Sequence, residues 1–213
     1  PKEVYFSSYG LREGILYDQM PETVRNLNPL IEACRYQERS TARFPGFGED
    51  LFKWILPVFE KSSKLELDLY YAACLLHDTS WRAHPDYRAE VCFESVTRAN
   101  FGGIDHNGRL FLALALMTRY KNTQSEGANK SFSILSEDMS KRAIILGQVI
   151  RLGAMISGNS AKNLYASRLT RTKNIVILAV DRSKKNLIGE PVRKRFFALV
   201  KTIGVEGKII IND

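Results

Sequence analysis

The sequence has little histidine, and its few cysteines form no motif. Among its 213 residues there are three histidines, at positions 77, 84 and 106, and three cysteines. No two cysteines have the Cys-x-x-Cys spacing of redox or zinc motifs, so their pattern indicates neither chemistry. We interpret Cys34, Cys74 and Cys92 as reduced, mostly buried thiols of a cytoplasmic protein.

Other motifs are missing too, and each absence argues against a class of function. There is no Gly-rich loop ending in Lys-Ser or Lys-Thr for phosphate binding, and no Gly-x-Ser-x-Gly elbow of a serine hydrolase. No apolar run approaches the ~18 residues of a membrane span, and no signal peptide opens the chain. Because the chain starts at Pro1 without an initiating Met, we expect a fragment of a longer protein.

What the sequence does have is an excess of positive charge and enough apolar residues for a core. Lys and Arg number 31 against 23 for Asp and Glu, a formal net charge of +8, and 45% of the residues are hydrophobic. Such an excess favours polyanionic partners, namely nucleic acid, polyphosphate, nucleotides or anionic lipid, without choosing among them. An unspecialised basic surface would have the same composition.

Periodicity predicts a mainly helical chain that ends in a small α+β unit. Residues 4–6 read as the end of a strand and residues 11–20 as a short helix. The pattern from 24 to 157 is helical, beginning with an amphipathic helix over 24–39, and it includes two helices that are apolar nearly all round, over 65–77 and 110–117. After residue 160 we expect a ββαβ unit with elements at 164–169, 174–180, 191–203 and 208–211.

His77-Asp78, at the end of an apolar helix, is the sharpest candidate for chemistry. A metal-dependent phosphohydrolase of the HD type uses such a pair to hold a divalent ion, which activates water for attack on phosphorus. That kind of site takes a further histidine from an earlier helix, and no histidine precedes His77. Since more donors than two are usual, we interpret His77 and Asp78 as a vestigial metal pair. Local hydrogen bonding at the end of a buried helix is the alternative.

Basic residues are the second candidate. Arg119 and Lys121 close the helix predicted over 110–117, and more cations follow them: Lys130, Lys141, Arg142 and Arg151. These side chains could line a groove that binds a chain of phosphates, or they could simply complement a helix dipole. We interpret the basic run at 193–195 as a solvated helix face.

Several segments resemble one protein family. Residues 7–17, SSYGLREGILY, are similar to the Gly-Leu-Arg-Glu-Gly stretch that closes the second actin-like domain in the exopolyphosphatase and guanosine pentaphosphate phosphohydrolase family. The likeness continues at Leu75-Leu76-His77-Asp78, Thr118-Arg119-Tyr120 and Arg151-Leu152-Gly153. Lys121 stands where the family often has histidine, and Arg151-Leu152-Gly153 stands where active HD hydrolases would carry a late aspartate.

The resemblance implies a three-part organisation. Residues 1–22 would be the remnant of an actin-like (ribonuclease H-like) domain, 23–160 an HD-like helical domain, and 161–213 a small α+β domain. The complete protein would release terminal phosphate from inorganic polyphosphate or guanosine pentaphosphate with magnesium, which the missing N-terminal domains would bind. Arg12 and Glu13 would approach that catalytic cleft.

The helical domain would then extend the polyphosphate path through Arg119 and Lys121 and would pair two subunits as a homodimer. We expect no catalytic residue, cofactor or membrane contact in this chain. An autonomous HD-type phosphohydrolase acting on nucleotides is the alternative. A nucleic-acid binder is a weaker one, because no aromatic-rich RNA-binding signature is present.

Overall fold

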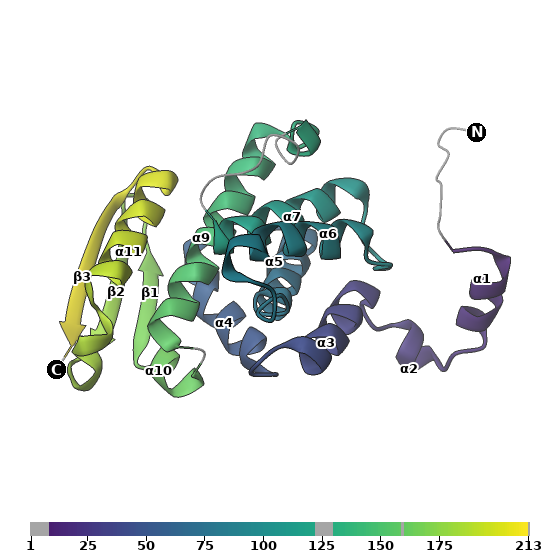
Figure 1. Ribbon diagram of the computed structural model, residues 1–213, viewed down its shortest axis with the longest axis horizontal. Helices are drawn as coiled ribbons and strands as arrows, with labels where there is room; N and C mark the ends of the chain where they lie inside the picture. The colour runs from purple at the N-terminus through teal and green to yellow at the C-terminus, as the bar shows by residue number, and fades with distance from the viewer. Residues whose placement is uncertain (1–8, 122–129, 159, 213) are drawn as a thin grey trace.

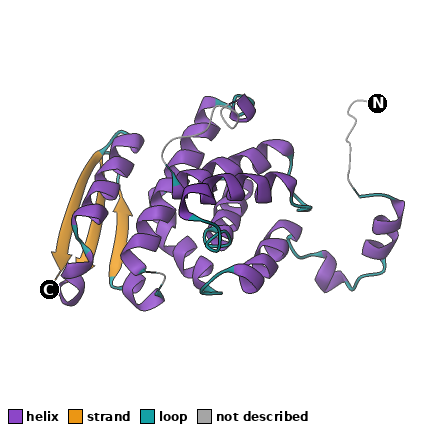
Figure 2. Cartoon of the chain, viewed as in Figure 1, coloured by secondary structure: helices purple, strands orange, loops and turns teal. Residues whose placement is uncertain are grey.

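Helices make up most of the chain, and a small sheet lies at its C-terminal end (Figures 1 and 2). The computed structural model describes residues 9–121, 130–158 and 160–212. The prediction of a mainly helical chain with a small C-terminal sheet is confirmed. The α-helices are α1 (Leu11–Asp18), α2 (Glu22–Arg25), α3 (Pro29–Thr41), α4 (Phe47–Ile55), α5 (Lys64–Leu76), α6 (Arg88–Arg98), α7 (His106–Tyr120), α9 (Glu137–Ser157), α10 (Ala161–Tyr165) and α11 (Glu190–Ile203), joined by the short 3-10 helices η1 (Leu56–Val58), η2 (Pro85–Tyr87) and η3 (Arg182–Leu187).

Polar caps explain where the long helices begin. Ser63 and Glu66 form a capping box at the start of α5. The Asp105 carboxylate accepts a hydrogen bond from the Gly108 backbone at 2.7 Å and starts α7. The Ser136 hydroxyl accepts one from the Met139 backbone at the start of α9. These caps fix the ends of the helices that carry the candidate site.

The prediction of one helix over 24–39 was wrong, because the chain breaks there into α2 and α3. Pro29 is the first residue of α3, and the Asn28 side chain caps it by accepting from the backbone of Leu30 at 3.0 Å. A proline has no N–H to donate and disfavours helical geometry in the residue before it. Pro29 therefore separates two helices that share similar apolar spacing.

The core of the helical part lies where α5, α7 and α9 pack together. Helix α7 is buried from Leu110 to Thr118. Helices α7 and α9 touch at Gly147, where an added Cβ would lie 2.3 Å from the carbonyl oxygen of Ala115 and 2.6 Å from Cβ of Thr118. Gly147 thus permits a backbone approach that a larger residue would prevent.

We expect Gly147→Ala to lower the free energy of unfolding by about 2 kcal/mol, because the methyl group must push the two helices apart. For a chain of this length the melting temperature should fall by about 6 °C, which differential scanning calorimetry would measure. Gly14→Ala is the matched control, since nothing lies within 4 Å of a Cβ at Gly14. Equal melting temperatures for the two variants would contradict the close approach.

The sheet has the order β1-β2-β3, with β1 and β2 antiparallel and β2 and β3 parallel. Leu178 in the central strand pairs in register with Leu169 and Ile209. Gly207 lets α11 pack closely, because a Cβ there would meet Val200 at 2.8 Å. Helix α11 connects the parallel pair and lies against the sheet, between it and α9 (Figure 1). The strands are β1 (Ser167–Arg171), β2 (Ile175–Asp181) and β3 (Glu206–Asn212).

The strand predicted over 164–169 was misplaced by a few residues. Its first residues belong to α10, and β1 begins only at Ser167. Leu164 is fully buried where α10 packs on α9 and α4, so an apolar side chain there serves a helix. Trp54 then fixes the start of β1, because its indole N–H donates to the Ser167 carbonyl at 3.2 Å.

Helices α1 and α2 lie apart from the helical body (Figure 1). Neither contains a buried residue, although the Tyr9 hydroxyl before α1 donates to the Asn100 carbonyl at 3.1 Å. The strand end predicted at residues 4–6 lies outside the described residues. Within the described part of the chain, no helix combines the length and apolarity needed to cross a bilayer.

Candidate functional site

His77 and Asp78 lie buried at the C-terminal end of α5, each with 2% of its surface exposed. His77 caps the helix, and its Nδ1 is 2.7 Å from the Cys74 carbonyl oxygen. The ring of Phe47 packs against the imidazole at a centroid distance of 5.5 Å. This environment holds the imidazole in place within the core.

The Asp78 carboxylate is bound by Arg43. The Arg43 Nε donates to one carboxylate oxygen at 2.8 Å, and Nη2 donates to the other at 2.5 Å. The Arg43 guanidinium also lies 5.6 Å from the Trp81 ring centroid. Burial would raise the pKa of Asp78, but the hydrogen bonds from Arg43 and the nearby charges of His77 and Arg119 outweigh it and lower that pKa. Asp78 is therefore a carboxylate paired with arginine.

This pairing fits a metal ligand poorly. Both oxygens of Asp78 already accept hydrogen bonds from Arg43, so a divalent ion would have to displace a guanidinium. In the described ranges, no group of three or more His, Cys, Asp or Glu side chains is placed to hold a metal. Metal binding by His77 and Asp78 stays a prediction.

The last turn of α7 packs beside this pair. The Tyr120 hydroxyl donates to the His77 carbonyl at 3.0 Å, which ties the end of α7 to the end of α5. The Arg119 guanidinium carbon lies 4.3 Å from the Tyr120 ring centroid. Lys121 is exposed, and its Nζ is 3.6 Å from a carboxylate oxygen of Glu90. Of the two cations predicted to bind phosphate, Arg119 therefore packs inward against Tyr120, and Lys121 lies at the surface.

Two further arginines extend the positive region around Arg119. Arg151 lies one helical turn after Gly147, so it shares the side of α9 that meets the end of α7. Burial and the positive charges of Arg195 and Arg119 lower the pKa of Arg151 to about 10. Arg195 comes from α11, which packs on α9. We call Arg119, Arg151 and Arg195 the arginine cluster.

The arginine cluster borders a partly exposed stripe of α9. Residues along this stripe recur every three or four positions, which places them on one side of the helix. Gln148 belongs to it, and its Oε1 is buried with no hydrogen-bond partner among the described residues. Ile145, next to the stripe, and Ile203 of α11 line one pocket, so α11 runs along this side of α9. The stripe consists of Lys141, Ile144, Gln148, Arg151 and Met155.

The structure brings together some predicted site residues and leaves others apart. Asp78 and Arg119 lie in one region, whereas Arg12 and Glu13 lie on α1, away from the helical body (Figure 1). Arg12 pairs with Glu13 at 3.1 Å, and Glu13 accepts from the backbone that starts α1. Sequence reasoning missed Arg43 as the partner of Asp78.

A family model described as the C-terminal part of exopolyphosphatase matches residues 37–210. The match takes in α4 to α11 and most of the sheet, and with them the Asp78–Arg43 pair and the whole arginine cluster. No protein of curated function matches the chain. The resemblance inferred from the sequence is therefore confirmed at the level of the family. The chain belongs to the exopolyphosphatase C-terminal family.

Proposed function

We propose that this chain is the substrate-binding and dimerising C-terminal region of an exopolyphosphatase-like enzyme. The whole enzyme would release terminal phosphate from inorganic polyphosphate or guanosine pentaphosphate. The single observation that supports substrate binding here is the arginine cluster, which gathers guanidinium groups from α7, α9 and α11. Family membership supports the reaction and the class of substrate.

The chemistry of the cluster suits a chain of phosphates. A guanidinium presents a planar fork of N–H groups that matches two oxygens of one phosphate. The positive charges of Arg195 and Arg119 repel that of Arg151, and a polyanion that binds there would relieve this repulsion. A region whose own charges oppose folding is typical of a binding site.

The buried pair at the end of α5 positions this surface. Asp78, held by Arg43, stands close enough to Arg119 to feel its charge, and Tyr120 ties α7 to His77. The alternative, an autonomous HD-type phosphohydrolase, requires Asp78 to leave Arg43. Catalysis and magnesium binding would belong to N-terminal actin-like domains, so no catalytic step is assigned to this chain. We further propose a cytoplasmic homodimer; the buried free cysteines agree with a reducing compartment.

Arg151→Met is expected to stabilise the protein and to weaken polyphosphate binding. The pKa of Arg151 is lowered on folding, so its charged form opposes folding at neutral pH, and this penalty is lost only as the pH rises past about 10. Because the side chain is partly exposed, removing the charge should add only about 1 kcal/mol to the free energy of unfolding, or about 3 °C in melting temperature.

The dissociation constant for polyphosphate should rise by about tenfold in the same variant, as isothermal titration calorimetry would show. Arg193→Met, on the exposed side of α11, is the control and should change neither quantity. Reduced stability with unchanged affinity would contradict the assignment of Arg151 to a binding site.

A further inference from the structure

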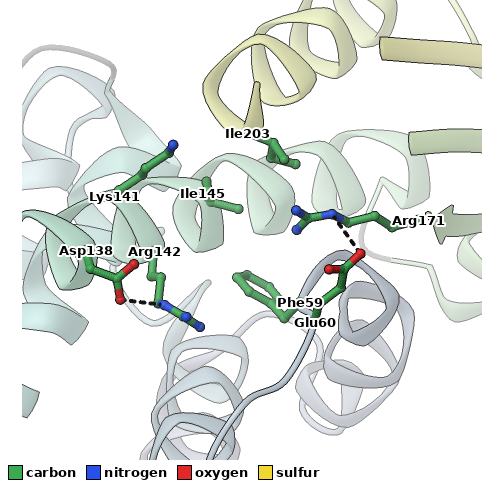
Figure 3. Close-up of a pocket in the computed structure, with 8 residues that line it drawn as sticks. All are labelled: Phe59, Glu60, Asp138, Lys141, Arg142, Ile145, Arg171 and Ile203. Carbon is green, nitrogen blue, oxygen red and sulfur yellow. Dashed lines mark hydrogen bonds and ion pairs between the residues drawn. The ribbon is translucent and has the colours of Figure 1, made fainter. Parts of the chain in front are cut away.

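A second cationic region adjoins the N-terminal end of the stripe on α9 at Lys141, in a pocket of about 270 Å³. Arg142 in this pocket stands nine positions before Arg151, which is two and a half turns and therefore the opposite side of the helix. The pocket opens where the helical part meets the C-terminal sheet (Figure 3). Its walls are Phe59, Glu60, Asp138, Lys141, Arg142, Ile145, Arg171 and Ile203.

Each of the two acidic residues that line the pocket lies beside an arginine: Asp138 beside Arg142, and Glu60 beside Arg171. Arg142 also pairs with Glu66, which lies outside the pocket wall. Its Nη1 lies 3.0 Å from Glu66 and its Nε 2.8 Å from Asp138. In the described part of the chain, Lys141 has no carboxylate oxygen within 4.0 Å of its Nζ. Arg142 is thus occupied by two carboxylates, Glu66 and Asp138, and Lys141 is available at the rim.

Arg171 supplies the inner positive charge. Its side chain is 19% exposed, and its Nη1 donates to the Val58 carbonyl at 2.5 Å. The Nε of Arg171 is buried and 3.7 Å from a Glu60 oxygen, too far for a hydrogen bond. Figure 3 shows Arg171 and Arg142 approaching the pocket from opposite sides, with Phe59 between them. A mostly buried guanidinium with an unused donor favours an anionic ligand.

The remaining walls are apolar. Phe59 lies between the two arginines, and Ile145 and Ile203 lie above it (Figure 3). The Phe59 ring is held against Tyr70 at a centroid distance of 4.3 Å, so its face is fixed. A pocket of 270 Å³ has the volume of about nine liquid water molecules, enough for one ring and one phosphate but not for a polymer.

We propose that this pocket binds a small phosphomonoester with a single aromatic ring, its phosphate on Arg171 and Lys141 and its ring against Phe59. A dianionic phosphate would pair with Lys141 and would compete with Glu60 for Arg171, which a group of higher charge does better than a carboxylate. Binding would join η1, α9, β1 and α11, and would strengthen the packing of the sheet on the helices.

Phenyl phosphate is the probe, titrated into the protein by isothermal titration calorimetry with inorganic phosphate and benzoate as comparisons. Phenyl phosphate should bind one per chain, about tenfold tighter than either comparison, because only it fills both the charged and the apolar parts. Equal affinity for inorganic phosphate, or no binding of phenyl phosphate at millimolar concentration, would overturn the proposal.

Variants separate this pocket from the polyphosphate site. Arg171→Met should weaken phenyl phosphate binding by about tenfold and leave polyphosphate affinity unchanged, whereas Arg151→Met should do the reverse. Arg168→Met, an exposed position on the same strand, is the control for β1. If Arg171→Met does not fold, Lys141→Met at the exposed rim should weaken phenyl phosphate binding, and unchanged binding in that variant would overturn the proposal.

Discussion

Replacing Arg119, Arg151 and Arg195 with glutamine together is expected to weaken polyphosphate binding by about a thousandfold. Each guanidinium that binds phosphate should contribute about 1.4 kcal/mol, which corresponds to a factor of ten per residue. The dependence of log affinity on log salt should also become shallower by about two to three units, because fewer counterions are released. Calorimetric titrations at several salt concentrations would measure both quantities.

A charge-matched variant tests whether these positions matter or only the total charge. Arg193, Lys194 and Lys201 lie on the exposed side of α11, and changing all three to glutamine removes the same charge. We expect that variant to bind polyphosphate nearly as well as the unmodified chain. If both triple variants lose affinity equally, the general excess of positive charge binds the polymer and the arginine cluster has no special role.

Asp78→Asn is expected to lower the free energy of unfolding by about 3 kcal/mol, because it breaks a largely buried ion pair and leaves Arg43 without its carboxylate. The pKa of Asp78 is lowered in the folded protein. Its stabilising contribution is therefore complete above about pH 4, and it is lost as the pH falls through the lowered folded value. Urea unfolding from pH 7 downward should show the variant and the unmodified chain converging in acid.

Two controls separate the ion pair from a metal site. Arg43→Met should lose a similar amount of stability, and the double variant should lose less than the sum, which identifies the two side chains as partners. If a chelator destabilises the unmodified chain as much as Asp78→Asn does, a bound metal and not Arg43 is the partner of Asp78.

Much of the helical framework follows from local sequence. Apolar residues all round the two central predicted helices indicated burial, and α5 and α7 are buried in the structure. Arg119 could be found because it ends such a helix. Pro29 was a visible stop signal, yet the similar apolar spacing on both sides of it suggested one helix.

The partners of the site residues could not be predicted from local sequence. Arg43 is 35 residues from Asp78, and no local pattern connects them. Arg195 lies in a run of three cations, and their local pattern indicates a solvated helix face. Only the packing of α11 on α9 brings that side chain towards Arg151. Contacts between distant segments depend on tertiary packing, and the spacing of apolar residues along the chain does not predict which segments will meet.

The position of Arg195 on the helix between β2 and β3 means that the arginine cluster spans the junction of the helical bundle and the terminal sheet. Neither half alone holds all three guanidinium groups. A polyanion bound to all three would therefore hold the terminal sheet against the helices, so that ligand occupancy and the packing of the last fifty residues or so would be thermodynamically linked.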